Sequence, residues 1–493
     1  MYHGGAGVGR SFPKSRLRPC FAPCAISISA CRRQAVDRML KIAAISHVDA
    51  DDPVAVSGAH PVTAARFVAD VERVAEQLPA RPHLVNFCMD RYRFAVGLIA
   101  ALVRGQVSLL PPNQTPEMLR QLQRDYGELY ALSDTLQELG AIEQVMYPLA
   151  AGESTPRSSI RQFSVPAFAE DQVAAIAFTS GSTGLPTPHR KTWGALARGA
   201  TAEAERFELH LGGRATLVGT VPAQHMYGLE STVLMALRGG LALHAGRPFY
   251  PADVAAALAE IPGDRVLVTS PVHLRALLNE NVQLPQLRLI VCATAPLSPA
   301  MAAHAEARYA APLHEVYGFT ESGMVATRRT VQGPSWHCLR DVRLHREGEG
   351  VSVAGGHVEN KVPFTDVIEP DGNDVFVLHG RNADLVNIAG KRTSLGYLNH
   401  QLNDIEGVHD GVFFMPDESG EGVTRLTAFV VAPGVSRNDL IGALRARIDP
   451  AFLPRPLYLV DALPRNATGK LPREALLRYA QILLAGADRE NPA

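Results

Sequence analysis

Hydroxyl and glycine residues are concentrated in one short stretch of the chain, residues 178–186. Directly after the apolar run 173–177, four hydroxyl side chains are interleaved with two glycines: Thr179, Ser180, Gly181, Ser182, Thr183 and Gly184. A buried strand that opens into such a loop presents backbone N–H and side-chain O–H donors to one small volume, and phosphate oxygens commonly bind there. The stretch therefore predicts a nucleotide phosphate loop. A plain Ser/Thr/Gly turn between two elements is the alternative interpretation.

The loop does not have the P-loop pattern, which requires a glycine, four further residues and then Gly-Lys-Ser/Thr at the start of a helix. Gly184 is followed by a leucine and a proline. The two Gly-Lys pairs elsewhere in the chain, at 390–391 and 469–470, lack the first glycine of the pattern. The sequence therefore argues against P-loop chemistry.

Further segments follow the loop in a fixed order. They are residues 293–297 (Ala-Thr-Ala-Pro-Leu), 317–321 (Tyr-Gly-Phe-Thr-Glu), 365–366 (Thr-Asp), 380–392 and 464–473. Together with the loop, they resemble the signature segments of the adenylate-forming superfamily. That superfamily contains acyl- and aryl-CoA synthetases, adenylation domains of nonribosomal peptide synthetases and firefly-type luciferases. The resemblance covers roughly residues 50 to 480, which is nearly the whole chain.

The resemblance implies an ATP-dependent carboxylate ligase. A carboxylate is a poor acyl donor because its leaving group would be an oxide, so it first attacks the α-phosphorus of ATP and expels pyrophosphate. The resulting acyl adenylate has a good leaving group, and a thiol then takes the acyl group. Positioning and charge stabilisation are most of the protein's task in such a reaction. The implied cofactors are ATP and Mg²⁺, and the implied acceptor is CoA or a phosphopantetheinyl carrier protein.

The resemblance also implies roles for single residues around the phosphates. The loop from Thr179 to Gly184 would hold the β- and γ-phosphates through its hydroxyls and N–H groups. Glu321 would bind Mg²⁺, and Thr320 would lie beside the α-phosphate. Taken alone, a glutamate such as Glu321 is usually a solvated or capping carboxylate. It is the ordered set of segments that gives it a role.

The remaining implied roles concern the ribose, the reacting carboxylate and the acyl group. Asp366 would accept hydrogen bonds from the ribose hydroxyls with support from Arg381, and Tyr317 would belong to the same nucleotide site. Lys470, a compact ammonium group on a flexible stem, would bridge the carboxylate and α-phosphate oxygens in the first transition state. His225, in the segment 222–228, resembles an element at the acyl site, and a packed core histidine is the alternative.

The chain departs from the family pattern at several positions. The usual Lys-Gly after Pro186 is replaced by residues 187–188 (Thr-Pro), which leaves His189, Arg190 or Lys191 as the source of positive charge. The segment that begins with Gly380 and Arg381 resembles the hinge of the family. An acidic residue is often found two positions after this arginine, but this chain has Ala383 there and Asp384 one position later. With these departures, the resemblance supports adenylation more strongly than it supports the thioester-forming state or a particular thiol acceptor.

Strand-like and helix-like patterns alternate along the chain, which predicts an α/β fold with substantially parallel sheets. The expected strands are 54–56, 83–87, 107–110, 173–177, 216–218, 265–269 and 289–292, and the expected helices are 64–78 and 94–104. The pattern restarts after Arg381 with a strand at 426–431 and a helix at 440–448. We therefore expect an N-terminal ATP- and acyl-binding domain at 39–380 with mixed or parallel sheets flanked by helices. A smaller, mobile α+β domain at 381–493 would carry Lys470.

The first 38 residues differ in composition from the remainder, since they contain several glycines, lysines and arginines but no acid before Asp37. An organellar transit peptide has this character. We favour two alternatives to a transit peptide: a disordered leader, or translation that starts at Met39. The segment is excluded from the fold prediction.

Composition restricts the partners. The net charge of −1 offers no electrostatic footprint for nucleic acid or an anionic membrane. No apolar run reaches the roughly 18 residues that a spanning helix needs. The six cysteines do not have the spacing of a metal site, and free thiols suit a reducing cytoplasm. The expected partners are a small carboxylic acid and, as a candidate acceptor, an acyl carrier protein.

The sequence thus predicts a ligase that makes an acyl or aryl adenylate and then a thioester. Within the superfamily, the variant segment 187–191 is similar to the ligases of aryl-polyene and related pigment pathways, which load an aryl acid onto an acyl carrier protein. A medium-chain acyl-CoA synthetase is the alternative enzyme. A catalytically reduced homologue that only binds an adenylate is the alternative from another class, and the presence of Glu321 and Lys470 argues against it.

Overall fold

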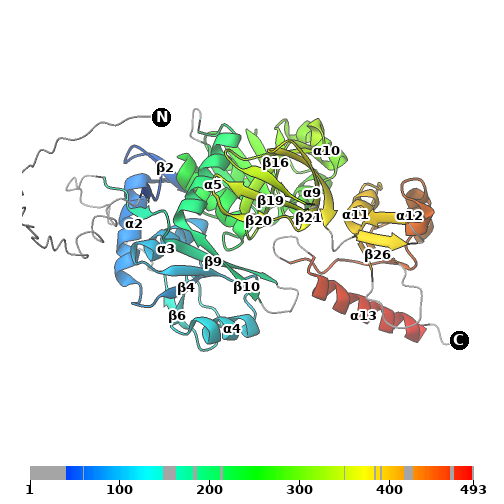
Figure 1. Ribbon diagram of the computed structural model, residues 1–493, viewed down its shortest axis with the longest axis horizontal. Helices are drawn as coiled ribbons and strands as arrows, with labels where there is room; N and C mark the ends of the chain where they lie inside the picture. Colours follow the sequence, from blue (N-terminus) through cyan, green and yellow to red (C-terminus); the bar gives the residue numbers. More distant parts are fainter. Residues whose placement is uncertain are drawn as a thin grey trace, which may run out of the picture. The chain divides into compact units, whose positions relative to one another are not determined.

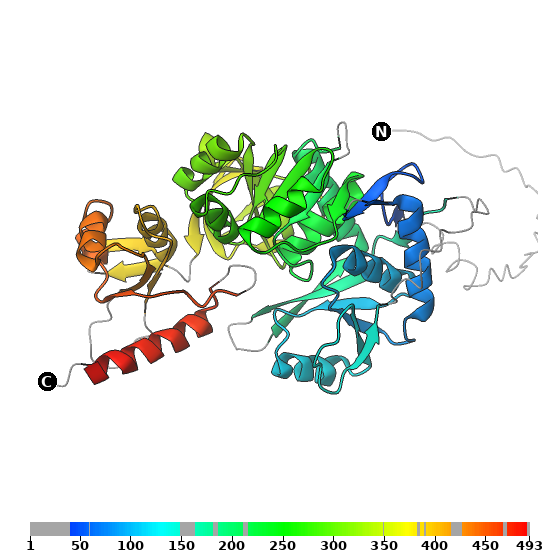
Figure 2. The same cartoon turned by 180° about the vertical axis from the view of Figure 1, so that it is seen from behind.

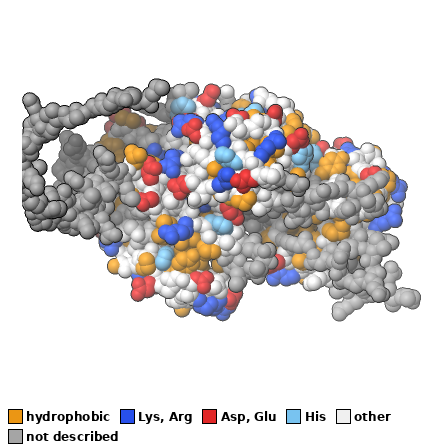
Figure 3. All heavy atoms as spheres, in the orientation of Figure 1, with side chains coloured by type: hydrophobic (Ala, Val, Ile, Leu, Met, Phe, Trp, Pro, Cys, Tyr) orange, Lys and Arg blue, Asp and Glu red, His pale blue; other side chains and the backbone are white. Residues whose placement is uncertain are grey.

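The structure is a computed structural model, and the compact unit that it contains begins at Lys41. The predicted leader, residues 1–38, lies outside the described residues. On the face drawn in Figure 3, acidic and basic side chains of the described residues are intermixed, as a net charge of −1 suggests. The described residues are 40–58, 60–147, 163–180, 186–210, 215–348, 350–381, 385–388, 391–415, 426–466 and 471–490.

A six-stranded sheet has the order β10-β9-β5-β4-β6-β7. All neighbouring strands in it are parallel except β10, which returns antiparallel to β9 as a long hairpin (Figure 1). Its strands are β4 (His83–Asn86), β5 (Val107–Leu110), β6 (Leu129–Ser133), β7 (Glu143–Met146), β9 (Val173–Ser180) and β10 (Pro186–Thr192). The predicted phosphate loop is therefore the tip of a hairpin.

An eleven-stranded sheet has the order β21-β22-β17-β16-β15-β14-β13-β11-β12-β2-β3. Its middle, from β15 to β2, is parallel, and antiparallel strands extend it at both ends. The parallel strands are nearly continuous apolar runs because both of their faces are covered. The strands are β2 (Pro53–Ser57), β3 (His60–Thr63), β11 (Thr216–Gly219), β12 (Ala242–His244), β13 (Arg265–Thr269), β14 (Leu289–Cys292), β15 (Leu313–Phe319), β16 (Gly323–Arg328), β17 (Ser335–Cys338), β21 (Asp366–Asp371) and β22 (Val375–Arg381).

Several helices begin where a short polar side chain caps the first turn. Thr63 accepts from the N–H of Arg66, and Thr192 accepts from the N–H of Ala195, so each satisfies a backbone donor that the helix leaves free. These two helices are α2 (Ala64–Gln77) and α5 (Trp193–Arg206). The other helices before residue 380 are α3 (Arg91–Val103), α4 (Pro116–Tyr126), α6 (Met226–Gly228), the π-helix η1 (Leu229–Leu234), α7 (Met235–Gly239), α8 (Pro251–Ala259), α9 (Pro271–Asn279), α10 (Pro299–Tyr309) and the 3₁₀ turn η2 (Thr330–Gln332).

Smaller sheets complete the fold. Hydrophobic residues from Val386 onward pack into clusters of their own. The predicted helix at 440–448 begins earlier, at Arg437, because Ser436 provides its N-cap. The elements are β1 (Lys41–Ala43), β8 (Ala167–Ala169), β18 (Arg343–Glu347), β19 (Gly350–Gly355), β20 (Val358–Pro363), β23 (Leu385–Ile388), β24 (Lys391–Ser394), α11 (Leu395–Asn403), β25 (Asp410–Phe414), β26 (Thr427–Val431), α12 (Arg437–Arg445), η4 (Pro450–Phe452), β27 (Leu457–Leu459) and α13 (Arg473–Glu490).

The arrangement confirms the predicted α/β class, with large sheets and flanking helices. The helices α2 and α3 pack against each other beside the six-stranded sheet (Figure 2). Among the described residues, no helix is both long and apolar enough to cross a bilayer. The predicted strands and helices before residue 380 are all present, with ends that differ by a few residues from the predicted ranges.

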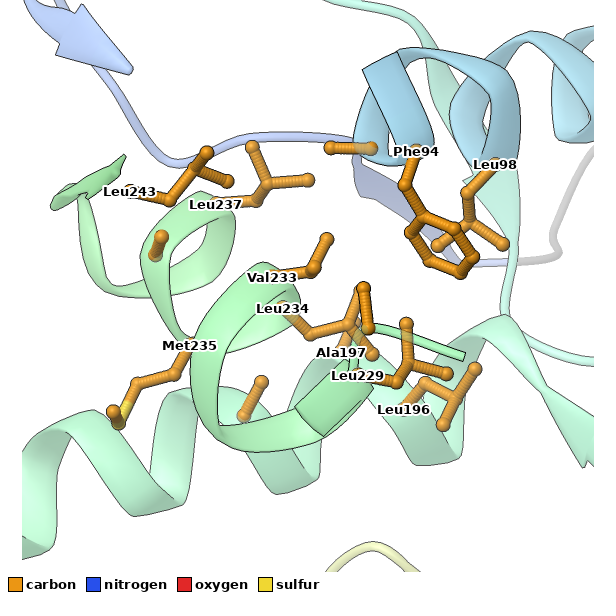
Figure 4. Close-up of a cluster of buried hydrophobic side chains, with 14 of the residues drawn as sticks. Phe94, Leu98, Leu196, Ala197, Leu229, Val233, Leu234, Met235, Leu237 and Leu243 are labelled. Atoms are coloured by element: carbon orange, nitrogen blue, oxygen red, sulfur yellow. The ribbon is translucent and has the colours of Figure 1, made fainter. Parts of the chain in front are cut away.

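The main hydrophobic core joins the helices of the two large sheets. Figure 4 shows Phe94 of α3 and Leu196 of α5 directed toward Leu229 and Val233 of η1, and all of them are buried. Burying such side chains contributes about 1.5–3 kcal/mol each relative to leaving them exposed. The chain from Leu229 to Gly239 is thus held between α3 and α5.

A buried arginine adds polar contacts to this core. Arg91, the first residue of α3, is 1% exposed. Its Nη2 donates to the carbonyl oxygens of Gly219 (3.1 Å) and Val221 (2.7 Å), its Nη1 donates to that of Gly246 (2.9 Å), and its Nε donates to Thr232 Oγ1 (3.0 Å). Burial lowers the pKa of Arg91 to about 10, so it is still charged at neutral pH. One side chain of α3 therefore holds the chain that leaves β11 and β12.

We expect Arg91→Met to lower the free energy of unfolding by about 3 kcal/mol or more, because several buried carbonyl groups lose their donors together. Arg91→Lys should recover only part of this loss, since an ammonium group has no planar fork. Denaturant unfolding measures both variants. The matched control is Arg104→Met at the exposed end of the same helix, which should change stability by less than about 0.5 kcal/mol. Equal stability of Arg91→Met and the control would contradict the role of Arg91.

Candidate active site

The turn between β15 and β16 carries the predicted Thr320 and Glu321. These strands are antiparallel, with a register shift between Tyr317 and Gly318. A side chain at Gly318 would place its Cβ 2.5 Å from the carbonyl oxygen of Gly323, so glycine is required for the close approach. The Glu321 side chain is 38% exposed. The sequence Tyr-Gly-Phe-Thr-Glu thus forms a tight hairpin that presents a carboxylate to solvent.

Tyr317 connects this hairpin to the predicted ribose-binding carboxylate. Its hydroxyl donates to Asp366 Oδ2 over 2.7 Å. The ring of Tyr317 is stacked parallel to that of Phe364, with 6.0 Å between centroids. Asp366 begins β21 and pairs in register with Arg381 at the end of β22. The structure therefore brings three predicted nucleotide-site residues together, although the side chain of Arg381 lies outside the described residues.

The predicted phosphate loop is shorter than the sequence suggested. Strand β9 continues to Ser180 and β10 starts at Pro186, because alternating backbone pairs hold the two strands together up to that point. The tip, which contains Gly181, Ser182, Thr183 and Gly184 of the prediction, lies outside the described residues. The side chain of Ser180 also lies outside them. Thr179 is described, and it is partly buried.

The base of the loop lies next to Glu321. His189 Nε2 is 3.0 Å from Thr179 Oγ1 and 3.5 Å from Glu321 Oε1. Burial lowers the pKa of His189, more than the nearby Glu321 carboxylate raises it, so the imidazole is mainly neutral at pH 7. The two segments that the sequence assigned to phosphate and to Mg²⁺ are thus in contact.

The three candidates for the missing positive charge have different surroundings. Lys191 is buried, and its Nζ donates to the backbone oxygen of Glu321 over 2.9 Å, so it is directed to the turn. Arg190 is exposed, as expected for the residue between two inward-facing positions of a strand. Arg190 therefore projects from the face of β10 opposite to the one from which His189 and Lys191 approach Glu321.

The segment 293–297 follows β14 at the same edge of the sheet. Thr294 has φ 87°, a left-handed conformation that is strained for a β-branched residue. The N–H of Leu297 donates to Glu315 Oε1 over 3.3 Å, and Arg328 Nε donates to Glu315 Oε2 over 2.6 Å. A buried carboxylate therefore ties the segment to β15 and β16.

The segment 222–228, which contains His225, turns sharply between β11 and η1. A Cβ at Gly228 would lie 1.9 Å from the carbonyl oxygen of Pro222, so no other residue fits there. Tyr227 anchors the segment, because its hydroxyl lies 3.0 Å from the backbone oxygen of Thr269 and 3.1 Å from that of Val291. His225 is half-buried at this turn. This position is compatible with either of its two predicted roles.

Lys470 lies outside the described residues, as do residues 382–384 of the predicted hinge. The segment that leads to Lys470 is anchored, because Arg465 binds Asp410 with two hydrogen bonds of 2.6 and 2.8 Å. A bidentate pair of this kind restricts orientation as well as distance. The sequence alone did not indicate Asp410 as a partner.

Sequence reasoning missed two buried acids behind the Glu321 turn. Glu203 of α5 is fully buried and accepts a hydrogen bond of 2.7 Å from Ser231, and Glu230 is 6% exposed. Burial raises the pKa of Glu203 to about 8 and that of Glu230 to about 7. The signal for Glu230 in the sequence was its place inside the otherwise apolar and hydroxyl-bearing run 229–234.

The arrangement suits a nucleotide that arrives with its cation. In the described part of the chain, no group of three or more His, Cys, Asp or Glu side chains could hold a metal ion by itself. Mg²⁺ commonly uses one or two carboxylates together with substrate phosphates. The exposed Glu321 carboxylate next to the phosphate loop fits that donor set.

Comparison with known proteins gives consistent results. Residues 47–355 match the family described as AMP-binding enzyme. The chain is 29% identical to the 4-coumarate–CoA ligase of Rhodobacter capsulatus over 63% of this chain and 78% of that protein. It is 26% identical to the chondramide synthase of Chondromyces crocatus over 90% of this chain, which is 13% of that protein.

A solved structure has the same fold. The O-succinylbenzoate coenzyme A synthetase of Bacillus subtilis, in complex with ATP and magnesium ion, matches with a TM-score of 0.71 at 20% identity. The match covers 86% of this chain and 96% of that chain. At this identity, the likeness concerns the fold.

Glu203 should make stability depend on pH. Its pKa is raised in the folded chain, so the folded state binds the proton more tightly than the unfolded state. The resulting stabilisation is complete below about pH 4 and is lost as the pH rises through about 8. We expect the free energy of unfolding to fall over this range by up to about 1.4 kcal/mol per pH unit from this group.

Glu203→Gln should remove that part of the slope while it preserves an acceptor for Ser231. Denaturant unfolding at several pH values between about 5 and 8 measures the slope. Glu208→Gln, an exposed acid just beyond the same helix, is the control and should leave the slope unchanged. A slope in Glu203→Gln that equals the slope of the parent would show that Glu203 is not the titrating group.

Proposed function

The chain belongs to the AMP-binding enzyme family, and we propose that it is an AMP-forming acid–thiol ligase that acts on a small aryl acid. The observation that carries the proposal is the junction of β10 with the Glu321 turn. His189, at the base of the phosphate loop, lies 3.5 Å from the Glu321 carboxylate, while Tyr317 of the same hairpin binds Asp366. Groups suited to phosphates, a cation and a ribose therefore lie on one short hairpin and its neighbours.

In the first half-reaction, the protein orients ATP and the carboxylate for in-line attack. The loop 181–184, with Thr179 and Ser180 before it, would hold the β- and γ-phosphates, and Thr320 would contact the α-phosphate. Asp366 would accept hydrogen bonds from the ribose hydroxyls, with its own orientation set by Tyr317. A residue held in one orientation loses little entropy when the substrate binds, and such positioning is a large part of the rate gain.

Glu321 would hold Mg²⁺ together with phosphate oxygens. When bound, the cation neutralises charge on the phosphates and helps pyrophosphate to leave. The carboxylate oxygen of the acid attacks the α-phosphorus, the bond to the bridging oxygen of pyrophosphate breaks, and an acyl adenylate forms. Lys470 would stabilise the negative charge on the attacking carboxylate and the α-phosphate during this step.

In the second half-reaction, a thiol attacks the acyl carbon and AMP leaves. We propose a domain boundary at about 380 and a hinge at 381–384, and the separate hydrophobic clusters after Val386 support a second unit. The relative that is named as a coenzyme A ligase supports CoA as the acceptor. An acyl carrier protein is the second candidate acceptor, because of the variant segment 187–191.

The class of carboxylic acid substrate is proposed from a relative of known name. The relative named for 4-coumarate supports an aryl acid. A medium-chain aliphatic acid is the alternative that a substrate panel tests directly. The cytoplasmic location that the cysteines suggested stays a prediction; Cys88, Cys292 and Cys338 are free and buried.

We expect carboxylate-dependent exchange of radiolabelled pyrophosphate into ATP that requires Mg²⁺. A panel of aryl and aliphatic acids should give the fastest exchange with an aryl acid, because the enzyme reverses adenylation only for acids that it activates. Omission of the acid or addition of EDTA is the control. If folded protein gives no exchange above background with any acid, the ligase proposal fails and an adenylate-binding module remains.

Lys470→Ala should separate the two half-reactions. Loss of one preorganised electrostatic group should slow adenylation by roughly 10²- to 10³-fold, whereas thiol attack on a supplied acyl adenylate should be nearly unchanged. Lys470→Arg should recover little, because a planar fork does not replace a compact ammonium group. Lys361→Ala, at an exposed lysine of β20, is the control. Wild-type exchange by Lys470→Ala would remove this lysine from the mechanism.

A further inference from the structure

Strand β10 connects two parts of the proposed active site. It starts at Pro186, directly after the phosphate loop, and it passes the Glu321 turn before α5 begins at Trp193. Two of its residues approach Glu321 from the same strand face, as residues i and i+2 do. His189 lies 3.5 Å from the carboxylate, and Lys191 donates to the main-chain oxygen.

The contact made by Lys191 is unusual for a lysine. The residue is only 6% exposed, and its Nζ lies 2.9 Å from the backbone oxygen of Glu321. Lysines are almost never this buried without compensation, because moving an ammonium group out of water is costly. The burial of Lys191 therefore requires a partner charge and a specific acceptor.

Burial lowers the pKa of Lys191, and the carboxylates of Glu230 in η1, Glu321 and Glu359 oppose this shift, Glu230 most strongly. Glu230 also contacts the turn itself. A Cβ at Gly323 would lie 2.7 Å from Glu230 Oε1, and the nearby backbone of Met324 partly offsets the burial that raises the pKa of Glu230. Lys191 thus bonds to the turn at Glu321, while Glu230 lies against it two residues later, at Gly323.

A third buried group completes the support. The ring Nε2 of His357 bonds to the backbone oxygen of Met324, and Ser231 Oγ lies 3.5 Å from the sulfur of the same residue. Both His357 and Ser231 are buried. The start of β16 is therefore held by polar contacts from β10, from η1 and from the segment before β20. None of these groups contacts the solvent face where Glu321 presents its carboxylate.

We propose that Lys191 is a positioning residue for adenylation, which sets the location of the Thr320–Glu321 turn relative to the phosphate loop. The proposal rests on the ligase function proposed above and extends it to a residue that touches neither substrate. Since a single strand carries both the end of the loop and Lys191, the hydrogen bond to Glu321 fixes their separation. The chain therefore uses a buried lysine to preform the site that would receive ATP with its cation.

The test uses Lys191→Met, Glu230→Gln and the double variant in the full chain. Lys191→Met alone leaves a buried acid without its partner charge, and this variant can fail to fold. The double variant removes both charges at nearly constant volume, so it should fold. Lys361→Met, at an exposed lysine paired with Glu347, is the matched control.

The first measurement needs no nucleotide. Amide hydrogen exchange should accelerate by about tenfold or more across residues 318–324 of the double variant, because the turn has lost a main-chain contact. Exchange in helix α10 and in the control should match the parent. Unchanged protection of 318–324 in the folded double variant would overturn the proposal, even if the parent had no ligase activity.

The second measurement is kinetic. In pyrophosphate exchange, the double variant should lose roughly 10- to 100-fold in kcat/KM for ATP. A displacement of a site group by about 1 Å can cost up to about 100-fold in rate. Its thiol reaction with a supplied acyl adenylate should remain within about twofold of the parent. Equal losses in both half-reactions would indicate a general structural defect and contradict the positioning role.

Discussion

The buried guanidinium of Arg91 is the contact on which the two large sheets depend. It lies at the start of α3, beside the six-stranded sheet, and its hydrogen bonds end on backbone oxygens that follow β11 and β12 of the other sheet. A buried carbonyl without a donor is costly, so these segments have one satisfied arrangement. The turn at 222–228 and the helix η1 continue from that point, and both contribute buried side chains to the core around Val233.

From this constraint, the candidate site is built at the edge where the parallel strands end. Open α/β sheets commonly bind ligands at the carboxyl ends of their strands. Here β14 leads into the segment 293–297, β15 leads into the Glu321 turn, and the hairpin of β9 and β10 lies against that turn. Buried acids and Lys191 support the turn from inside, while its outer face carries the groups suited to a nucleotide.

Polar burial in this protein has a consistent pattern. Arg91 and Lys191 bond to main-chain oxygens, and Glu315 accepts a main-chain N–H, so each fixes the path of a loop. Replacing one such group alone is costly, because its partner is left buried without a hydrogen bond. These groups also specify one backbone arrangement, because their directional bonds fail when a loop shifts. A site that must place phosphate, cation and carboxylate together benefits from that property.

The sequence by itself determined the α/β class, the predicted strands before residue 380 and the ordered motifs, because periodicity and short-range turn chemistry are local properties. Tyr317 and Asp366 could be named from their motifs. Tertiary structure alone decided that they are hydrogen-bonded, that β9 extends to Ser180, and that Lys191 donates to the backbone oxygen of Glu321. These facts depend on contacts between residues far apart in the chain, such as positions 191 and 321. No local pattern records which buried charge meets which distant carbonyl.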